Sequence, residues 1–369
     1  MAKIAFFTLN AYDMLTGGYE GNAVGGAQLQ QILIGKELAD RGHTVYFVEY
    51  DTDNKSETVY DGIQIIKKPL PTGSEPSRAS TAIRGTWRVL RRIEPDVCYR
   101  RSLDFEMIPL VVHAQATNSR FVYNVAHNDE LTSSPHKFST GVKSTKLYRW
   151  LNRLVLSATD AVIVQNTKQA SLGTEHLKTN IHQIPNCYPS VRADPIDWQY
   201  DSPVVFWAAR FVDWKRPQTV FELAESLPHI TFVMAGDVSD NQFMERAAGL
   251  DNLELLGHVP FSEIDRYFAA ADLFLNTSED EGFPNTFLQA WANKTPVVSL
   301  NVDPSGIISS EGLGIVAGGS TIQLRDQIAD LVSDDDQIQQ LGNRSYNYLR
   351  ENHSVGSISD RYERVLVSG

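Results

Sequence analysis

Short apolar, β-branched runs alternate with helix-length amphipathic segments along almost the whole chain, and this alternation limits the fold more than any other feature. Such runs include KIAFFTL, HTVYFVEY and RFVYNVAH in the first half and PVVFWAAR, ITFVMAG and DLFLNTS in the second. Continuous apolar runs are typical of strands buried in parallel sheets, with helices covering both faces. Two successive sets predict two Rossmann-like, doubly wound α/β domains.

A proline-rich stretch separates the two sets. The segment IPNCYPSVRADPIDWQYDSP, residues 184–203, has four prolines and neither a helical nor a strand period, so it is interpreted as a linker. The terminal SVGSISDRYERVLVSG predicts one more helix. Ligands of open α/β sheets bind beyond the carboxyl ends of the strands, so we expect the loops there to line a cleft between the domains.

Net charge changes at the same boundary. Residues 1–190 carry 21 Lys and Arg against 18 Asp and Glu, a balance of +3. Residues 191–369 carry 12 against 27, a balance of −15, and the halves sum to −12. Neither half has the basic excess that would neutralise nucleic-acid phosphates, so we expect no nucleic-acid partner.

Cysteine use and hydropathy favour a cytoplasmic protein. Cys98 and Cys187 have no CxxC or Cys/His spacing, which argues against disulfides and a zinc site. The N-terminal MAKIAFFTLN is too short for a secretory signal. No apolar run approaches the ~20 residues that span a bilayer, so any membrane contact would be peripheral, at the inner face.

A glycine turn lies between the first strand and the first helix. In GGYEGNAVGGAQLQQ, Gly25 and Gly26 directly precede the helix, where a backbone without side chains can approach an anion. The spacing is not GxGxxG, which disfavours a nicotinamide-dependent dehydrogenase. An ordinary glycine turn is the alternative.

A cationic cluster follows the first strand of the second half. In WAARFVDWKRP, Arg210 lies at the strand end, and Lys215 and Arg216 precede the next helix. Cations beside a helix N-terminus would stabilise a diphosphate leaving group without a metal. The alternative is a solvated basic loop, and this interpretation is stronger for Arg216 than for Arg210.

The stretch SEDEGFPNTFLQ follows the strand DLFLNTS. Glu281 can accept hydrogen bonds from sugar hydroxyls, while a helix that begins near Asn285 and Thr286 directs backbone N–H groups at a phosphate. Gln289 lies about one helical turn further on, so its side chain can reach the same site.

Two features of the first half have competing interpretations. His127 ends the strand RFVYNVAH, where a place in the cleft and a structural hydrogen-bonding role are about equally favoured. Residues 81–95 predict a helix with Ile83, Trp87 and Leu90 on one face and arginines on the other. Such a helix can lie on an anionic membrane, or its apolar face can pack on the domain.

These stretches together resemble the GT-B glycosyltransferases of the large retaining family 4, over nearly the whole chain. The resemblance lies in GGAQ, LADRGHTVYFV, AVIVQNT, IPNCYP and ARFVDWKRP, and above all in LLGHVPFSEIDRYFAAADLFLNTSEDEGFPNTFLQAWANKTPVVS. It implies a first, acceptor-binding domain of residues 1–190 plus 354–369. The second domain, residues 191–353, would bind a nucleotide-sugar donor.

The resemblance also implies roles for individual residues. Arg210 and Lys215 would bind the donor diphosphate with Gly26 on the phosphate side, and Glu281 would contact the donor sugar. His127 matches a histidine at the junction of sugar and acceptor. The backbone at His258 and Val259 would hold the base. The residues expected beside Glu281 at the donor are Gly282, Phe283, Pro284, Asn285, Thr286 and Gln289.

Two positions depart from the family pattern. Gln289 replaces a second Glu that usually binds the ribose hydroxyls, and Pro284 replaces a frequent Gly and removes one N–H. We interpret both as substrate tuning. If Gln289→Glu tightened donor binding, a tuned enzyme would be favoured.

The sequence therefore predicts a retaining, metal-independent hexosyltransferase without a cofactor. It would use a UDP- or GDP-sugar and a saccharide or lipid-linked acceptor in polysaccharide biosynthesis. Two alternatives stay open: a non-catalytic nucleotide-sugar or glycan binder, with Gln289 as a mark of lost activity, and a nucleotide-sugar epimerase of the same fold.

Overall fold

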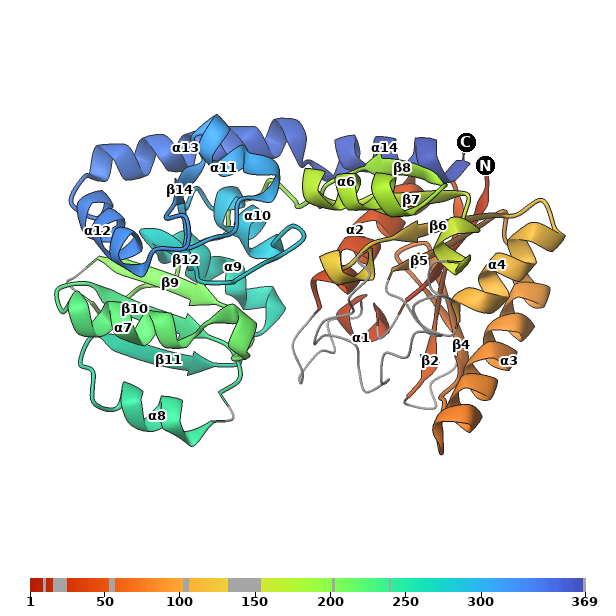
Figure 1. Cartoon of the computed structure of the whole chain (residues 1–369), viewed down its shortest axis with the longest axis horizontal. Coiled ribbons are helices and arrows are strands. Elements are labelled where there is room, and N and C mark those ends of the chain that lie inside the picture. The colour runs from red at the N-terminus through yellow and green to blue at the C-terminus, as the bar shows by residue number, and fades with distance from the viewer. Residues whose placement is uncertain are drawn as a thin grey trace. The chain divides into compact units, whose positions relative to one another are not determined.

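The computed structural model describes residues 1–8, 11–15, 25–52, 57–101, 106–131, 154–200, 203–238 and 240–367 (Figure 1). They form two compact units. The first comprises the N-terminal strand, Gly25–Asn186 and Val355–Gly369, and the second comprises Cys187–Ser354. The chain thus crosses from one unit to the other at 186/187 and at 354/355, close to the expected domain boundaries at 190/191 and 353/354.

The sheet of the first unit has eight described strands in the order β3-β4-β2-β1-β5-β6-β7-β8, parallel except where β3 pairs with β4. These strands are β1 (Lys3–Phe7), β2 (Thr44–Asp51), β3 (Thr58–Tyr60), β4 (Ile63–Pro69), β5 (Val97–Arg101), β6 (Arg120–Asn124), β7 (Ala161–Val164) and β8 (Asn180–Gln183). The described helices are α1 (Ala11–Leu15), α2 (Gly26–Asp40), α3 (Glu75–Ile93), α4 (Met107–Ala116), the 3₁₀ turn η1 (Asn128–Glu130), α6 (Thr167–His176) and α14 (Val355–Val367).

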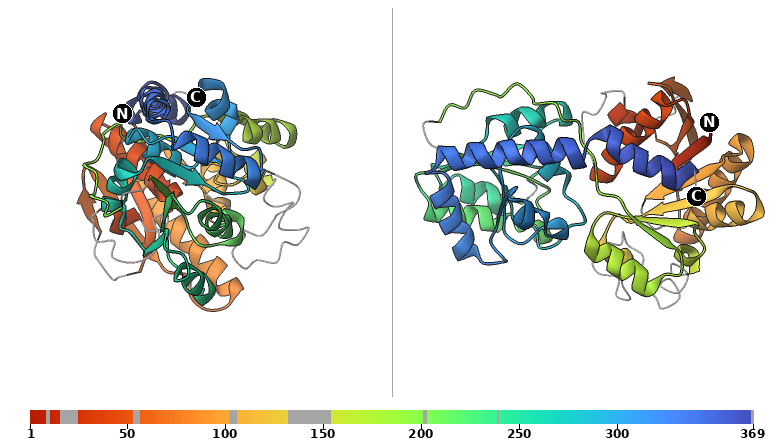
Figure 2. Two further views of the ribbon diagram at one scale, coloured as in Figure 1. Left: turned by 90° about the vertical axis from the view of Figure 1, so that its left-hand side faces the viewer. Right: turned by 90° about the horizontal axis from the view of Figure 1, so that it is seen from above.

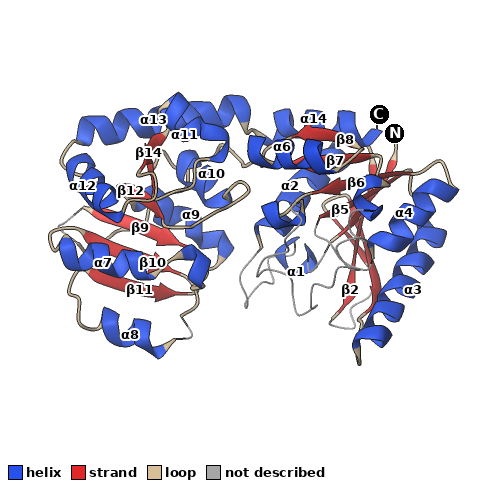
Figure 3. Ribbon diagram, in the orientation of Figure 1, coloured by secondary structure: helices blue, strands red, loops and turns tan. Residues whose placement is uncertain are grey.

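Helices cover both faces of this sheet, as its continuous apolar strands require (Figure 3). On one face, Leu90 of α3 and Leu110 of α4 are fully buried with Phe121 of β6. On the other face, α2 lies beside α14 in both Figure 1 and Figure 2. There Arg41, which follows α2, pairs with Asp360 of α14 at 2.5 Å.

The basic helix predicted over residues 81–95 is the second half of α3. Leu90 is in the core, and Trp87 packs against the core and against the ring of His113 at 6.3 Å. Arg84, Arg88, Arg91 and Arg92 are exposed. The apolar face of this helix therefore packs on the domain, and only its arginine face is available to a partner.

The second unit contains a parallel sheet with the described strands in the order β11-β10-β9-β12-β13-β14. The strands are β9 (Val204–Ala208), β10 (Thr231–Ala235), β11 (Leu253–Gly257), β12 (Leu273–Asn276), β13 (Val297–Ser299) and β14 (Gly314–Val316). The helices are η2 (Asp213–Lys215), α7 (Gln218–Ser226), α8 (Asn241–Ala247), α9 (Phe261–Ala270), α10 (Asn285–Ala292), η3 (Pro304–Gly306), α11 (Ile307–Glu311), α12 (Thr321–Leu331) and α13 (Asp335–Asn352).

Aromatic side chains fix the packing between this sheet and α9 and α10. Phe206 of β9 contacts Phe268 of α9 edge to face, with ring centroids 5.1 Å apart. Trp291 of α10 is fully buried. Phe274 of β12 likewise contacts Phe287 of α10, with ring centroids 6.4 Å apart, so both helices pack on the sheet. In the described part of the chain, no helix is long and apolar enough to span a bilayer.

Candidate active site

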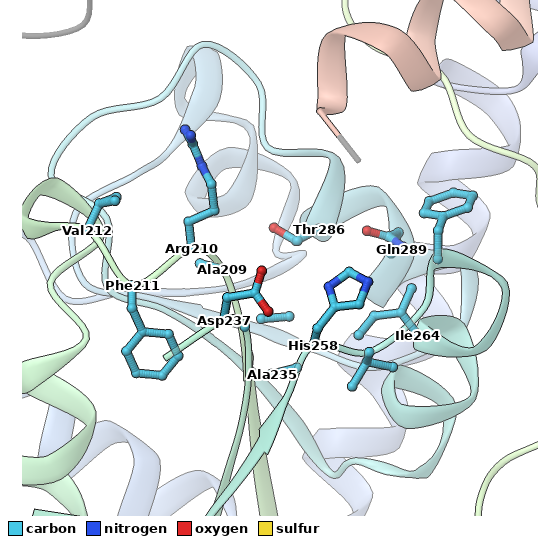
Figure 4. A pocket seen from close by; sticks show the side chains of 14 residues that line it. Ala209, Arg210, Phe211, Val212, Ala235, Asp237, His258, Ile264, Thr286 and Gln289 are labelled. Atoms are coloured by element: carbon cyan, nitrogen blue, oxygen red, sulfur yellow. The ribbon is translucent and has the colours of Figure 1, made fainter. Parts of the chain in front are cut away.

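A cavity of about 580 Å³ lies in the second unit at the carboxyl ends of three adjacent strands. Its walls come from the loops after β9, β10 and β11 and from one face of α9 and α10 (Figure 4). This is the sheet edge at which open α/β domains bind ligands. Of the predicted donor-binding residues, the cavity is lined by Arg210, His258, Val259, Thr286 and Gln289.

Two of the loops that line the cavity approach each other closely at Gly236 and Ala209. Gly236, which follows β10, has a φ of +154°, and a Cβ there would lie 2.0 Å from the carbonyl oxygen of Ala209. Glycine is therefore required at this position.

The cavity is polar at several points. Arg210, at the end of β9, is exposed and lines it. Asp237, which sequence reasoning missed, follows Gly236 and points its carboxylate into the cavity in Figure 4. The Nε2 atom of His258 is buried and has no hydrogen-bond partner among the described residues. A ligand here would meet one cation, one acid and an imidazole.

Lys215 and Glu281, predicted to act on the diphosphate and on the sugar, form an ion pair. Their side chains lie 2.7 Å apart, 13% and 14% exposed. Glu281 also accepts hydrogen bonds from Ser278 Oγ at 2.7 Å and from Asn276 Nδ2 at 3.2 Å. Burial acts to raise the pKa of Glu281, but Lys215 and these donors hold it below its ordinary value. Glu281 is thus a fixed, ionised carboxylate.

The loop that carries Lys215 is tied to the loop that carries Glu281. Thr277 Oγ1 donates to the carbonyl of Lys215 at 2.6 Å, and the N–H of Glu279 donates to the carbonyl of Trp214 at 2.9 Å. The Lys215 ammonium lies 4.2 Å from the centroid of the Trp214 ring. The ion pair is therefore held by backbone on both sides.

The segment after Glu281 enters α10 as predicted. Pro284 adopts an extended conformation, and α10 begins at Asn285. The buried ring of Phe283 packs against His353, with centroids 4.9 Å apart, so its side chain serves the core. Any contact that Phe283 makes with a donor would therefore have to come from its backbone. The roles of Gly282 and Pro284 toward a donor stay predictions.

Gln289 lines the cavity and hydrogen-bonds to two other side chains. It is 5% exposed, and its Nε2 donates to Asp265 Oδ1 at 3.0 Å and to the Tyr188 hydroxyl at 3.4 Å. That hydroxyl donates to Asp265 Oδ2 at 2.7 Å. A carboxylate only accepts, so the amide nitrogen of Gln289 must face Asp265, and its oxygen points into the cavity (Figure 4).

Sequence reasoning missed Asp265 and Tyr188 because no local pattern joins them to Gln289. Burial raises the pKa of Asp265, and the two hydrogen bonds that it accepts act against this. Burial and the Asp265 carboxylate raise the pKa of the Tyr188 hydroxyl well above its ordinary value, so it stays a donor. The amide of Gln289 thus supplies a donor to the Asp265 carboxylate, which an ionised glutamate at this position could not do.

The other predicted residues belong to the first unit. Gly25 precedes α2 with an extended backbone, and its carbonyl accepts from the N–H groups of Gln28 and Leu29. Gly26 is the first residue of α2. His127 is exposed just beyond β6, and its carbonyl accepts from the N–H of Glu130 at 3.2 Å. Their roles toward a donor stay predictions.

No cluster of three or more His, Cys, Asp or Glu suited to a metal ion occurs among the residues with described positions. Metal independence stays a prediction.

Comparison with known proteins agrees with this architecture. Residues 24–190 match the model of Glycosyltransferase Family 4, and residues 202–334 match that of Glycosyl transferases group 1. Over 280 residues, 72% of this chain and 82% of the relative, the chain is 26% identical to the lipopolysaccharide core biosynthesis glycosyltransferase LpsE of Rhizobium meliloti.

Solved structures share the fold at low identity. Sucrose-phosphate synthase from Thermosynechococcus elongatus superposes with a TM-score of 0.81 at 15% identity, covering 99% of this chain and 98% of its own. Anabaena HepE in complex with UDP and glucose gives 0.76 at 16% identity over the full length of both chains. The two domain matches and the shared fold make the chain a GT-B glycosyltransferase.

Proposed function

We propose that this glycosyltransferase is a retaining, metal-independent hexosyltransferase that uses a UDP- or GDP-sugar. The observation that carries the proposal is the second unit's cavity, lined by Arg210, together with the fixed Lys215–Glu281 ion pair on the neighbouring loops. The complex of HepE with UDP and glucose supports a nucleotide-sugar donor. The likeness to LpsE supports a saccharide or lipid-linked acceptor in surface polysaccharide synthesis.

In this proposal, each charged group acts on a different part of the donor. Arg210 and Lys215 stabilise the negative charge that develops on the departing diphosphate. Glu281, ionised and held by three donors, accepts from hydroxyls of the transferred sugar. The acceptor oxygen bonds to the anomeric carbon on the face from which the phosphate oxygen leaves. The acceptor proton passes to that phosphate oxygen, so no protein nucleophile is needed.

Gln289 would accept a hydrogen bond from a ribose hydroxyl through its oxygen. Asp265 and Tyr188 hold the amide nitrogen, so the group offered to the ligand is an acceptor, like the carboxylate that it replaces. The view of Gln289 as a mark of lost activity therefore has no support in its contacts. No observation favours a non-catalytic binder or a nucleotide-sugar epimerase over a transferase.

Substitution of Lys215 tests the proposal. Lys215→Ala removes the cation nearest to Glu281, and we expect transfer from the matching nucleotide sugar to fall at least a hundredfold. A thermal-shift screen of UDP-, GDP- and ADP-sugars first identifies the donor. Near-normal turnover in Lys215→Ala would overturn the assignment, and product formation without an acceptor would indicate the epimerase.

A peripheral membrane contact is proposed for the arginine face of α3. Arg84 and Arg88 are exposed on successive turns, and the apolar face is buried, so attraction to anionic lipid would be electrostatic. Co-sedimentation with vesicles of phosphatidylglycerol and phosphatidylcholine should fall when Arg84, Arg88, Arg91 and Arg92 are replaced by Gln. Unchanged binding would exclude α3 as the contact.

A further inference from the structure

Asp237 gives the donor cavity a carboxylate to which the proposed function assigns no role. Asp237 is exposed and lines the cavity, and its carboxylate points into it (Figure 4). The preceding Gly236 lies close against the Ala209 carbonyl, which fixes the backbone from which Asp237 projects. Asp237 forms no hydrogen bond or ion pair with another described residue. Its oxygens are therefore open to a ligand.

Strand register places Asp237 between two parts of the cavity. The last residue of β10 pairs with the last residues of β9 and of β11. The pairing continues past the strand ends, because the N–H of Gly236 donates to the carbonyl of Gly257 at 2.8 Å. Asp237, two residues beyond β10, thus lies between Arg210, two residues beyond β9, and Val259, two residues beyond β11.

Arg210 and Asp237 are neighbours of opposite charge that form no ion pair with each other. In Figure 4 the guanidinium of Arg210 points away from the carboxylate. A ligand that uses both groups must bring an anion to Arg210 and hydrogen-bond donors to Asp237. A nucleoside diphosphate meets this requirement, because its diphosphate is attracted by Arg210 and repelled by Asp237. Asp237 is then left for an uncharged part of the nucleotide.

The uncharged part that remains is the base. In the proposed function, the oxygen of Gln289 binds the ribose. The β11 side of the cavity, next to Asp237, contains the backbone of His258 and Val259, where we expect the base to lie. The apolar side chain of Ile264 continues this wall. A base against this wall has one edge beside the Asp237 carboxylate.

The three bases differ in the hydrogen-bonding groups on that edge. Guanine has two adjacent donors, N1–H and the N2 amino group, which can pair with both oxygens of one carboxylate. Uracil has a single N3–H between two carbonyl oxygens, and a carboxylate repels both oxygens. Adenine has an amino group beside N1, which is an acceptor. We propose that Asp237 selects guanine, so that the donor is a GDP-sugar.

The inference rests on the proposed function, because it identifies the donor of the same cavity. Nucleotide binding tests it without turnover. A preference for UDP would overturn this inference and leave a hexosyltransferase in place. Failure to bind any nucleoside diphosphate would overturn the proposed function as well.

The test is isothermal titration calorimetry of the full chain with GDP, IDP, UDP and ADP. IDP is GDP without the N2 amino group, so this pair isolates one of the two expected hydrogen bonds. We expect the wild type to bind GDP at least about tenfold more tightly than each of the other three. Equal binding of GDP and IDP by the wild type would overturn the proposal.

Substitutions of Asp237 identify the side chain responsible. Asp237→Ala should weaken GDP binding about tenfold or more and bring GDP and IDP to nearly equal affinity. Asp237→Asn replaces one acceptor oxygen with a donor, which suits N3–H and O4 of uracil, so it should shift the preference toward UDP. Asp251→Asn is the matched control, because Asp251 is an exposed acid of the same unit that does not line the cavity, and it should keep the wild-type order. Equal weakening of all four nucleotides by Asp237→Ala, or an unchanged order of affinities in both Asp237 variants, would contradict base selection.

Discussion

The substitution Gln289→Glu restores the residue that the family usually carries, and we predict that it impairs this protein. In the structure, Gln289 Nε2 donates to Asp265 Oδ1 at 3.0 Å. A carboxylate in its place would put two negative charges in contact in a buried position, and the donor to Asp265 would be lost.

The size of the effect follows from that distance. Two unit charges 3.0 Å apart repel by about 5.5 kcal/mol at an effective dielectric constant of 20. The variant can avoid this repulsion by protonating one of the two carboxyls. For a carboxyl with an ordinary pKa near 4.3, protonation at pH 7 costs about 4 kcal/mol, and this cost is the upper limit of the destabilisation. In the folded variant, the repulsion raises the pKa of this carboxyl above its unfolded value. The destabilisation is therefore small below pH ~4 and grows by about 1.4 kcal/mol per pH unit above it.

Chemical denaturation at pH 5 and pH 7 measures this dependence. We expect Gln289→Glu to be destabilised by about 1 kcal/mol at pH 5 and by about 4 kcal/mol at pH 7. Nucleotide affinity at pH 7 should fall at least tenfold. The double variant Asp265→Asn/Gln289→Glu exchanges donor and acceptor and should recover most of both losses. Tighter nucleotide binding by Gln289→Glu with unchanged stability would refute the role of Asp265.

Two further predictions concern single residues. Burial raises the pKa of Glu130 to about 7, so its contribution to stability is complete below the unfolded value of 4.5 and is lost as pH rises to about 7. Glu130→Gln should therefore remove about 3 kcal/mol of the fall in stability between pH 4.5 and pH 7, measured by urea unfolding, and an unchanged pH profile would contradict the assignment. Gly236→Ala should cost at least about 2 kcal/mol, because its Cβ would lie 2.0 Å from the Ala209 carbonyl oxygen, and should weaken nucleotide binding. Gly249→Ala is the matched control, since its nearest atom is 3.5 Å away, and equal effects of the two would contradict the steric explanation.

Features encoded locally were predictable from the sequence. Strands such as β9 and β10 follow from continuous apolar runs, and the start of α10 follows from Pro284 and Asn285. Arg210, Lys215 and Glu281 could be proposed because each lies between the end of a strand and the start of the next α-helix. The fold then predicts the sheet edge on which they lie.

Contacts between distant residues were not predictable. Gln289, Asp265 and Tyr188 come from α10, α9 and the linker, and no periodicity relates them. The sequence also could not show whether Trp87 faces a membrane or the core, since both give the same helical pattern. Arg100 and Arg101 are adjacent and identical in type, yet only the packed structure shows that one is paired.

The central claim is transfer of a hexose with retention of anomeric configuration. Once the thermal-shift screen has identified the donor, proton NMR of the product at early times gives the configuration of the new glycosidic bond directly. From an α-linked nucleotide sugar, the proposed mechanism gives an α-linked product with the wild type and almost none with Lys215→Ala. A β-linked product would contradict attack on the leaving-group face.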